Sequence, residues 1–123
     1  MKILIIDDSL VTRNIHKNAL KENKVSEDDM LEADNGLTAL EISMKENIGL
    51  FLVDWNMPGM NGLEFIKKLR GMPQYAETPI IMVTSEAAKY NVLEAIEAGA
   101  TNYVVKPVSA DALWKKISKY ISK

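Results

Sequence analysis

Residues 2–9 are Lys-Ile-Leu-Ile-Ile-Asp-Asp-Ser, in which four apolar residues lead directly into two carboxylates. A short apolar run bounded by polar residues is typical of a strand buried on both faces. Three further runs have the same form: residues 50–53 before Asp54, residues 80–83 before Thr84-Ser85, and residues 103–105 before Lys106. These runs predict four strands, and residues 30–33, where apolar and polar residues alternate poorly, are a weaker fifth candidate.

Segments with helical periodicity lie between the predicted strands. They cover residues 11–23, 37–44, 63–69, 87–98 and 110–121. Ser9 and Ser109 precede the first and the last segment, as helix-capping residues do. Five strands alternating with five helices predict an α/β fold in which a parallel sheet carries helices on both faces.

Apolar spacing within the segments predicts which helix faces are buried. The predicted faces of the first two helices are Ile15, Ala19 and Leu20, and Leu37, Leu40 and Met44. The last segment has one apolar stripe, which places Trp114 in the core with Leu113, Ile117 and Ile121. We expect His16 to be exposed or hydrogen-bonded rather than a metal ligand, and Trp55 to cover the acidic residues beside it.

Composition excludes several classes of protein. The chain has 123 residues, no Cys and one His, so it has no disulfide scaffold, thiolate zinc site or thiol nucleophile, and no G-x-S-x-G motif accompanies His16. A net charge of −2 gives no basic excess for nucleic acid, and no apolar run approaches the roughly 20 residues that span a membrane. We expect one cytoplasmic domain over residues 1–123.

Polar residues follow each of the four clear strands. The carboxyl ends of parallel strands share one edge of a sheet, where ligands bind. That edge would collect Asp7, Asp8, Asp54, Thr84 and Lys106. Each has an ordinary alternative, since an Asp-Ser pair after a strand caps helices and a lysine is commonly a solvated charge. Together, however, like charges about 4 Å apart repel by roughly 4 kcal/mol at an effective dielectric near 20. Lys106 and a hard divalent cation, Mg²⁺, would offset this repulsion.

A lysine, a hydroxyl and Mg²⁺ on carboxylates form a phosphate site, here without a G-x-x-x-x-G-K-[ST] loop. Asp54 stands alone after its strand, whereas Asp7 and Asp8 are paired as a metal cradle. Asp54 is therefore the candidate nucleophile toward phosphorus, forming an aspartyl phosphate. Phosphoryl transfer depends mainly on positioning and on charge neutralisation, which the metal and Lys106 would supply.

Four short motifs carry a family resemblance: Asp7-Asp8, residues 54–58 (Asp-Trp-Asn-Met-Pro) with Gly62, Thr84-Ser85, and residues 103–107 (Tyr-Val-Val-Lys-Pro). Together they resemble the receiver domains of two-component response regulators, most closely those that act in chemotaxis. The resemblance extends from Met1 to the last helix. It implies a single doubly wound, flavodoxin-like domain with five parallel strands in the order 2-1-3-4-5. It also implies a cis bond between Lys106 and Pro107.

The resemblance assigns roles to the site residues. Asp54 would accept the phosphoryl group, Lys106 would contact it, and Mg²⁺ would be bound by Asp7, Asp8, Asp54 and the backbone carbonyl of Asn56. Thr84 would be the switch hydroxyl that turns toward the phosphoryl group, and Tyr103 the aromatic ring that moves inward. Asn56 and Glu86 would tune the rate of dephosphorylation.

By the same resemblance, the protein is a stand-alone, monomeric response regulator that receives its phosphoryl group from a histidine kinase. It would be a self-catalysed switch rather than an enzyme that turns over an outside substrate. The apolar arc of the fourth helix is wider than a core contact needs, which predicts an exposed edge. The partner face would consist of Lys89, Val92, Ile96, Tyr103, Lys116 and Lys119, and the target would be a flagellar motor switch.

Several alternatives fit the same sequence. The chain could be a phosphorelay intermediate, or the receiver part of a larger transcription regulator. A phosphatase of the haloacid dehalogenase kind uses similar chemistry, but it requires Asp-x-Asp where this chain has Asn56, and it carries a cap domain. An adaptor that is never phosphorylated is disfavoured because all the site residues are present.

Overall fold

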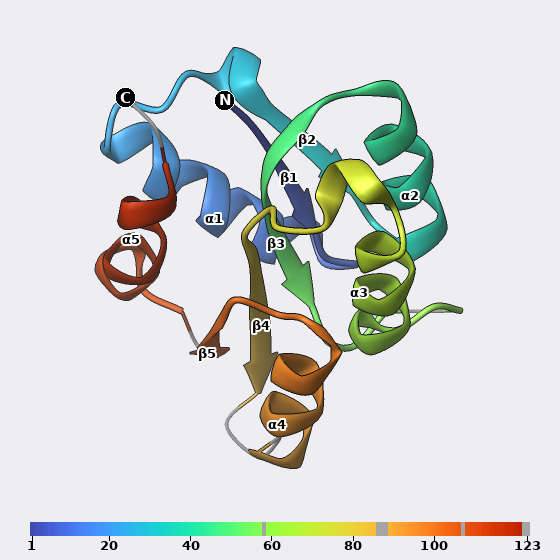
Figure 1. Cartoon of the computed structure of the whole chain (residues 1–123). Helices are drawn as coiled ribbons and strands as arrows, with labels where there is room; N and C mark the ends of the chain where they lie inside the picture. Colours follow the sequence, from blue (N-terminus) through green and yellow to red (C-terminus); the bar gives the residue numbers. More distant parts are fainter. Residues whose placement is uncertain (58, 86–88, 107, 122–123) are drawn as a thin grey trace.

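The computed structural model describes residues 1–57, 59–85, 89–106 and 108–121 (Figure 1). Its strands are β1 (Lys2–Ile6), β2 (Met30–Ala33), β3 (Ile48–Asp54), β4 (Ile80–Ser85) and β5 (Asn102–Lys106). Its α-helices are α1 (Leu10–Glu22), α2 (Gly36–Lys45), α3 (Gly62–Arg70), α4 (Lys89–Ala98) and α5 (Ala110–Ile117). Single 3-10 turns occupy Glu27–Asp29, Pro73–Tyr75 and Ser118–Tyr120. Ser9 and Ser109 cap α1 and α5, accepting hydrogen bonds from the amides of Thr12 and Ala112.

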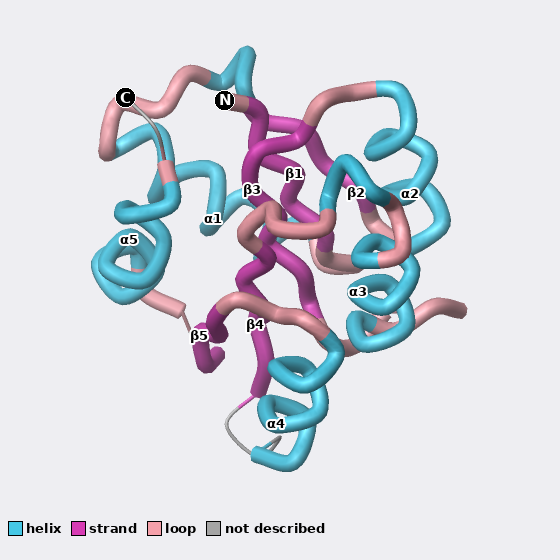
Figure 2. The backbone as a smooth tube through the Cα atoms, in the orientation of Figure 1, coloured by secondary structure: helices cyan, strands magenta, loops and turns pink. Residues whose placement is uncertain are grey.

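The five strands form one parallel sheet in the order β2-β1-β3-β4-β5, with β3 at its centre. Helices α1 and α5 lie side by side on one face of the sheet, and α2, α3 and α4 cover the other (Figures 1 and 2). The predicted α/β class and strand order are confirmed.

The sheet separates two apolar cores, which explains why its strands are nearly continuous apolar runs. Along β1, Ile3 and Ile5 belong to the core beneath α1 and α5, and Leu4 and Ile6 to the core beneath α2, α3 and α4. Successive side chains of a strand point to opposite faces, so residues two apart share a core. The same alternation determines which side of the sheet each residue at the carboxyl edge occupies.

The weakly predicted strand, β2, is confirmed, and the structure explains its poor alternation. Met30 faces the α1 side, where it is buried in the core. Glu32 lies on the same face two residues later, where Arg13 and Lys17 of α1 bind its carboxylate. A charged residue therefore occupies an inward position because two cations on the covering helix pair with it.

Helices α1 and α2 correct two predictions about buried faces. Ile15 is 41% exposed, whereas His16 is 1% exposed. The expectation that His16 is exposed or hydrogen-bonded is also wrong, because neither ring nitrogen has a partner within the described residues. In α2, Leu37 and Met44 are exposed, and Gly36, Ala39 and Ser43 face the protein. Gly36 packs closely against Met60, whose Sδ would lie 2.8 Å from a Cβ added at this position. The Ser43 hydroxyl is satisfied because it donates to the carbonyl of Ala39 at 2.7 Å.

The two tryptophans also differ from expectation. Trp55 is buried in the core under α2, α3 and α4, on the same side as Val53, so it does not cover the acidic residues. Trp114 is only partly buried, at the margin of the other core. The last α-helix ends at Ile117 rather than at residue 121, because the chain tightens into the 3-10 turn Ser118–Tyr120.

Candidate functional site

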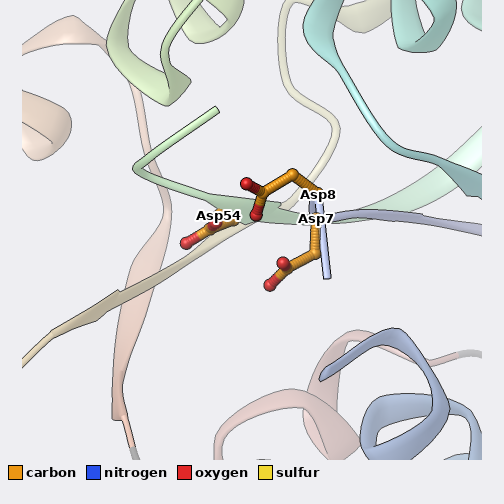
Figure 3. Close-up of side chains that lie close together, drawn as sticks. All are labelled: Asp7, Asp8 and Asp54. Atoms are coloured by element: carbon orange, nitrogen blue, oxygen red, sulfur yellow. The ribbon is translucent and has the colours of Figure 1, made fainter. Parts of the chain in front are cut away.

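Three carboxylates meet at the carboxyl edge of the sheet. β1 and β3 are neighbours, and their register pairs Ile6 with Val53, so Asp7 and Asp54 follow side by side. Asp8 lies next along the chain, and one oxygen from each of the three carboxylates lies within 4.8 Å of the others (Figure 3). The predicted convergence of these residues is therefore present in the structure.

Burial raises the free-energy cost of holding the three negative charges of this cluster close together. Asp7 is fully buried, Asp54 is 3% exposed, and Asp8 is exposed. Burial raises the pKa of Asp54, and the charges of Asp7 and Asp8 raise it further, although the hydrogen bond from Lys106 opposes them. Both oxygens of Asp7 are used, since Oδ1 accepts from the amide of Ser9 at 2.8 Å and Oδ2 from Lys106.

Lys106 reaches this cluster from β5. Its Nζ lies 3.0 Å from Oδ1 of Asp54 and 3.3 Å from Oδ2 of Asp7. Burial alone would lower the pKa of Lys106, but the hydrogen bonds and charges of Asp54 and Asp7 raise it overall. The alternation of β5 directs Lys106 to the α1/α5 side, the side that Val104 faces and on which Asp7 and Asp54 lie.

The residues present fit a hard divalent cation. Among the described residues, three carboxylates face the one ammonium group of Lys106 in this cluster, and two of the three are shielded from water. Carboxylate oxygens with an open, partly solvated side are the ligands that Mg²⁺ accepts. Asn56 is exposed in the segment after β3, two residues beyond Asp54.

Thr84 and Tyr103 occupy the opposite side of the sheet. Asp54 pairs with Val83, so Thr84, the next residue, points toward the α2–α4 face. Thr84 is 1% exposed, and its Oγ1 has no hydrogen-bond partner within the described part of the chain. Tyr103 pairs with Met82 on that same face and packs against its core, with Lys116 Nζ 4.9 Å from the ring centroid.

The predicted partner face is only partly assembled. In α4, Ile96 and its neighbour Leu93 are exposed, which confirms that the wide apolar stripe has an open edge. Lys116 lies beside Tyr103, but Lys119 lies over the ring of Tyr120 and lines a cavity of about 770 Å³ with Met1 and Trp114. That cavity borders the start of β1, at the other end of the strand from Asp7.

Some predicted features fall outside the described residues. They are Glu86, the first two residues of the predicted helix 87–98, the side chains of Lys89 and Ser85, Pro58, and Pro107 with the bond that precedes it.

Two residues near the site, Arg13 and Glu32, were not predicted from the sequence. Arg13 of α1 donates from Nη1 to the backbone carbonyl of Asp7 at 2.6 Å and from Nε to Glu32 Oε1 at 3.0 Å. The sequence offered two signals. Arg13 lies one helical turn after Ser9, and Glu32 interrupts the apolar pattern of residues 30–33. Neither signal indicates a contact by itself, because 19 residues separate Arg13 from Glu32.

Comparison with known proteins defines the family. Residues 3–118 match the model of the response regulator receiver domain. The chain belongs to the response regulator receiver family. A chemotaxis protein CheY homolog of Campylobacter jejuni is 45% identical over 118 residues, which is 95% of this chain and 89% of the relative. This membership favours a receiver domain over a phosphatase of the haloacid dehalogenase kind.

Solved structures agree with this assignment. The receiver domain superposes on the chemotaxis response regulator CheY4 of Vibrio cholerae with a TM-score of 0.88 and 32% identity, covering 98% of each chain. The receiver domain of sensor histidine kinase PA1611 from Pseudomonas aeruginosa shares the fold, with a TM-score of 0.85 and 19% identity, covering 97% of this chain and 95% of that one. Its structure has a magnesium ion coordinated in the active site cleft. No helix in the described part of our receiver domain is long and apolar enough to cross a membrane.

Proposed function

We propose that this receiver domain is a chemotaxis response regulator that accepts a phosphoryl group on Asp54 from a histidine kinase. The observation that carries the proposal is the placement of Asp54. It ends the central strand, it is nearly buried, and it lies beside the Lys106 ammonium and two further carboxylates. Lys106 orients the Asp54 carboxylate, and burial removes part of its hydration shell. Both conditions suit a nucleophile.

The transfer requires little covalent chemistry from the protein. An oxygen of Asp54 forms a bond to phosphorus as the bond from phosphorus to the donor imidazole nitrogen breaks, and the imidazole leaves as a neutral ring after taking up a proton. Asp7, Asp8, Asp54 and the carbonyl of Asn56 would hold Mg²⁺, which neutralises charge on the phosphoryl oxygens. Lys106, 3.0 Å from Asp54, would stabilise the same developing charge.

Thr84 and Tyr103 would convert this chemistry into a change of surface. The Thr84 hydroxyl is buried on the α2–α4 side without a partner among the described residues, and a phosphoryl oxygen at the carboxyl edge would offer it an acceptor once its side chain turns toward Asp54. An unmade buried hydrogen bond costs about 1–3 kcal/mol, which is enough to bias a two-state equilibrium. Tyr103 lies on the same side of the sheet and would move into the space that Thr84 leaves.

The downstream partner would bind the face formed by α4, β5 and α5. Leu93, Ile96 and Val105 expose apolar surface there, and Lys116 adds charge beside Tyr103. Similarity to chemotaxis proteins favours a flagellar motor switch as the target, met in the cytoplasm by a monomeric receiver domain.

Phosphorylation by a small donor tests the proposal. The receiver domain is incubated with acetyl phosphate and Mg²⁺, and the adduct is counted by intact mass and mapped after borohydride trapping. We expect one phosphoryl group on Asp54, none in Asp54→Asn, and normal labelling in Asp34→Asn, which alters an exposed carboxylate after β2. A labile adduct on another residue of the unaltered protein would overturn the proposal.

A further inference from the structure

Arg13 joins helix α1 to the turn that carries the acidic residues. Its Nη1 donates to the backbone carbonyl of Asp7 at 2.6 Å, and its Nε donates to Glu32 Oε1 at 3.0 Å. Lys17, one turn later in α1, binds the other oxygen of Glu32 at 3.1 Å. Each oxygen of Glu32 is thus held by a different cation of the same helix.

These contacts complete the immobilisation of Asp7. Its amide donates to the carbonyl of Ala33 at 3.1 Å, its Oδ1 accepts from the amide of Ser9 at 2.8 Å, and its carbonyl accepts from Arg13. The Asp7 carbonyl lies in the rigid peptide plane that leads to the Cα of Asp8. A hydrogen bond that fixes the Asp7 carbonyl therefore also fixes the Cα of Asp8, from which the Asp8 side chain extends.

We infer that Arg13 is a positioning residue that holds Asp7 and Asp8 in a cation-ready arrangement, and that Glu32 keeps the guanidinium in place. The inference rests on the proposed function, in which these carboxylates bind Mg²⁺. Mg²⁺ demands near-ideal geometry, so a turn that is already ordered binds it with a smaller loss of freedom. Groups that orient metal ligands typically change metal affinity by about 10–100-fold.

Charge alone predicts the opposite result, which makes the inference testable. Arg13 is a cation close to a cation site, so its removal would strengthen Mg²⁺ binding if only electrostatics mattered. Lys17 supplies a matched control, because it has the same charge, lies on the same helix and shares the partner Glu32, but within the described residues it forms no hydrogen bond or ion pair with Asp7. Positioning predicts weaker Mg²⁺ binding in the Arg13 variant alone, whereas charge predicts that neither variant binds Mg²⁺ more weakly than the wild type.

The experiment measures the dissociation constant for Mg²⁺ by calorimetry in the wild type, Arg13→Met and Lys17→Met. Methionine keeps an apolar stem at each position and removes the donors and the charge. We expect the constant to rise about 10–100-fold in Arg13→Met and to stay within about threefold in Lys17→Met. Thermal melts without Mg²⁺ accompany each titration, because a merely structural role would lower the melting temperature of Arg13→Met without changing its Mg²⁺ affinity.

Unchanged or tighter binding in Arg13→Met, or equal effects in the two variants, would overturn the inference. If Arg13→Met melts below the titration temperature, Arg13→Lys replaces it. One ammonium cannot reproduce the fixed fork of a guanidinium, so weaker binding is again expected, and unchanged binding again overturns the inference. Failure of the wild type to bind Mg²⁺, or binding that survives Asp8→Ala, would instead count against the proposed function.

Discussion

Lys106 Nζ lies 3.0 Å from Asp54 Oδ1, although the two residues are 52 positions apart and strand β4 lies between theirs. The alternation of β3 and β5 places both side chains on the α1/α5 side of the sheet, and the length of the lysine spans the intervening strand. The receiver domain therefore has a cation directly at the carboxylate that we propose as phosphoacceptor. Asp7 and Asp8 lie in the same cluster, and their negative charges favour the protonated form of Asp54.

Asp54→Asn should stabilise the receiver domain at neutral pH in the absence of Mg²⁺. The pKa of Asp54 is raised in the folded state by burial and by Asp7 and Asp8, so its ionisation opposes folding once the pH exceeds the ordinary range for an aspartate. We expect the melting temperature to rise by a few degrees, since about 1 kcal/mol shifts it by roughly 4 °C in a domain of this size. The gain should disappear below about pH 4, where the carboxyl is protonated in both states. A gain that is the same at pH 7 and pH 3.5 would contradict this explanation.

His16 should make the protein sensitive to mild acid. Its ring is 1% exposed, neither nitrogen has a partner in the described part of the chain, and burial, with the nearby charge of Lys106, lowers its pKa to about 4. The unfolded chain binds the proton near pH 6.5, so stability falls as the pH drops from about 6.5 toward 4, by up to about 3 kcal/mol. Urea unfolding of His16→Leu from pH 7 to pH 4 should show a smaller loss than the wild type. Parallel curves would mean that His16 does not titrate as described.

Thr84→Ala should separate phosphorylation from switching. Asp54 and Lys106 are unaltered in this variant, so acetyl phosphate should still label it. Without the hydroxyl, however, Tyr103 should not be drawn inward, and the amide NMR shifts of β5 and α4 should change little on labelling. One charge-assisted hydrogen bond contributes roughly 1.5–3 kcal/mol, close to the 2.7 kcal/mol that a 100-fold gain in partner affinity requires. Thr84→Ser keeps a hydroxyl and should retain the full response; equal shifts in the alanine and wild-type proteins would exclude Thr84 as the coupling residue.

The phosphoryl group on Asp54 should be short-lived. Water must attack in line with the bond to Asp54, and we expect Asn56 and Glu86 to border that approach without blocking it. Asn56 is exposed two residues beyond Asp54, whereas Glu86 lies outside the described residues. Decay of the adduct, followed with saturating Mg²⁺, should be slower in Asn56→Arg and in Glu86→Leu than in the wild type. If both decay at the wild-type rate, these positions have no timing role.

The fold class and the members of the acidic site could be predicted from the sequence. Apolar runs that end in Asp7, Asp54, Thr84 and Lys106 indicate buried parallel strands, and parallel strands bring their carboxyl ends to one edge. Local rules were sufficient here because strand burial and helix capping, as at Ser9, depend on neighbouring residues. The family resemblance added the strand order.

Which stripe of each helix faces the sheet could not be predicted from the sequence. Periodicity identifies apolar residues, but His16 is buried and Ile15 exposed because the packing of α1 against α5 and the sheet selects the stripe. In α2 the small residues Gly36 and Ala39 form the buried face, whereas Leu37 is exposed. Gly36 packs closely against Met60, and a larger side chain would disturb this contact. The contacts of Arg13 with Asp7 and Glu32 also depend on the fold, because they join α1 to the carboxyl edge and to β2. Such contacts produce no periodic pattern in the sequence, because each depends on how distant segments pack and not on neighbouring residues.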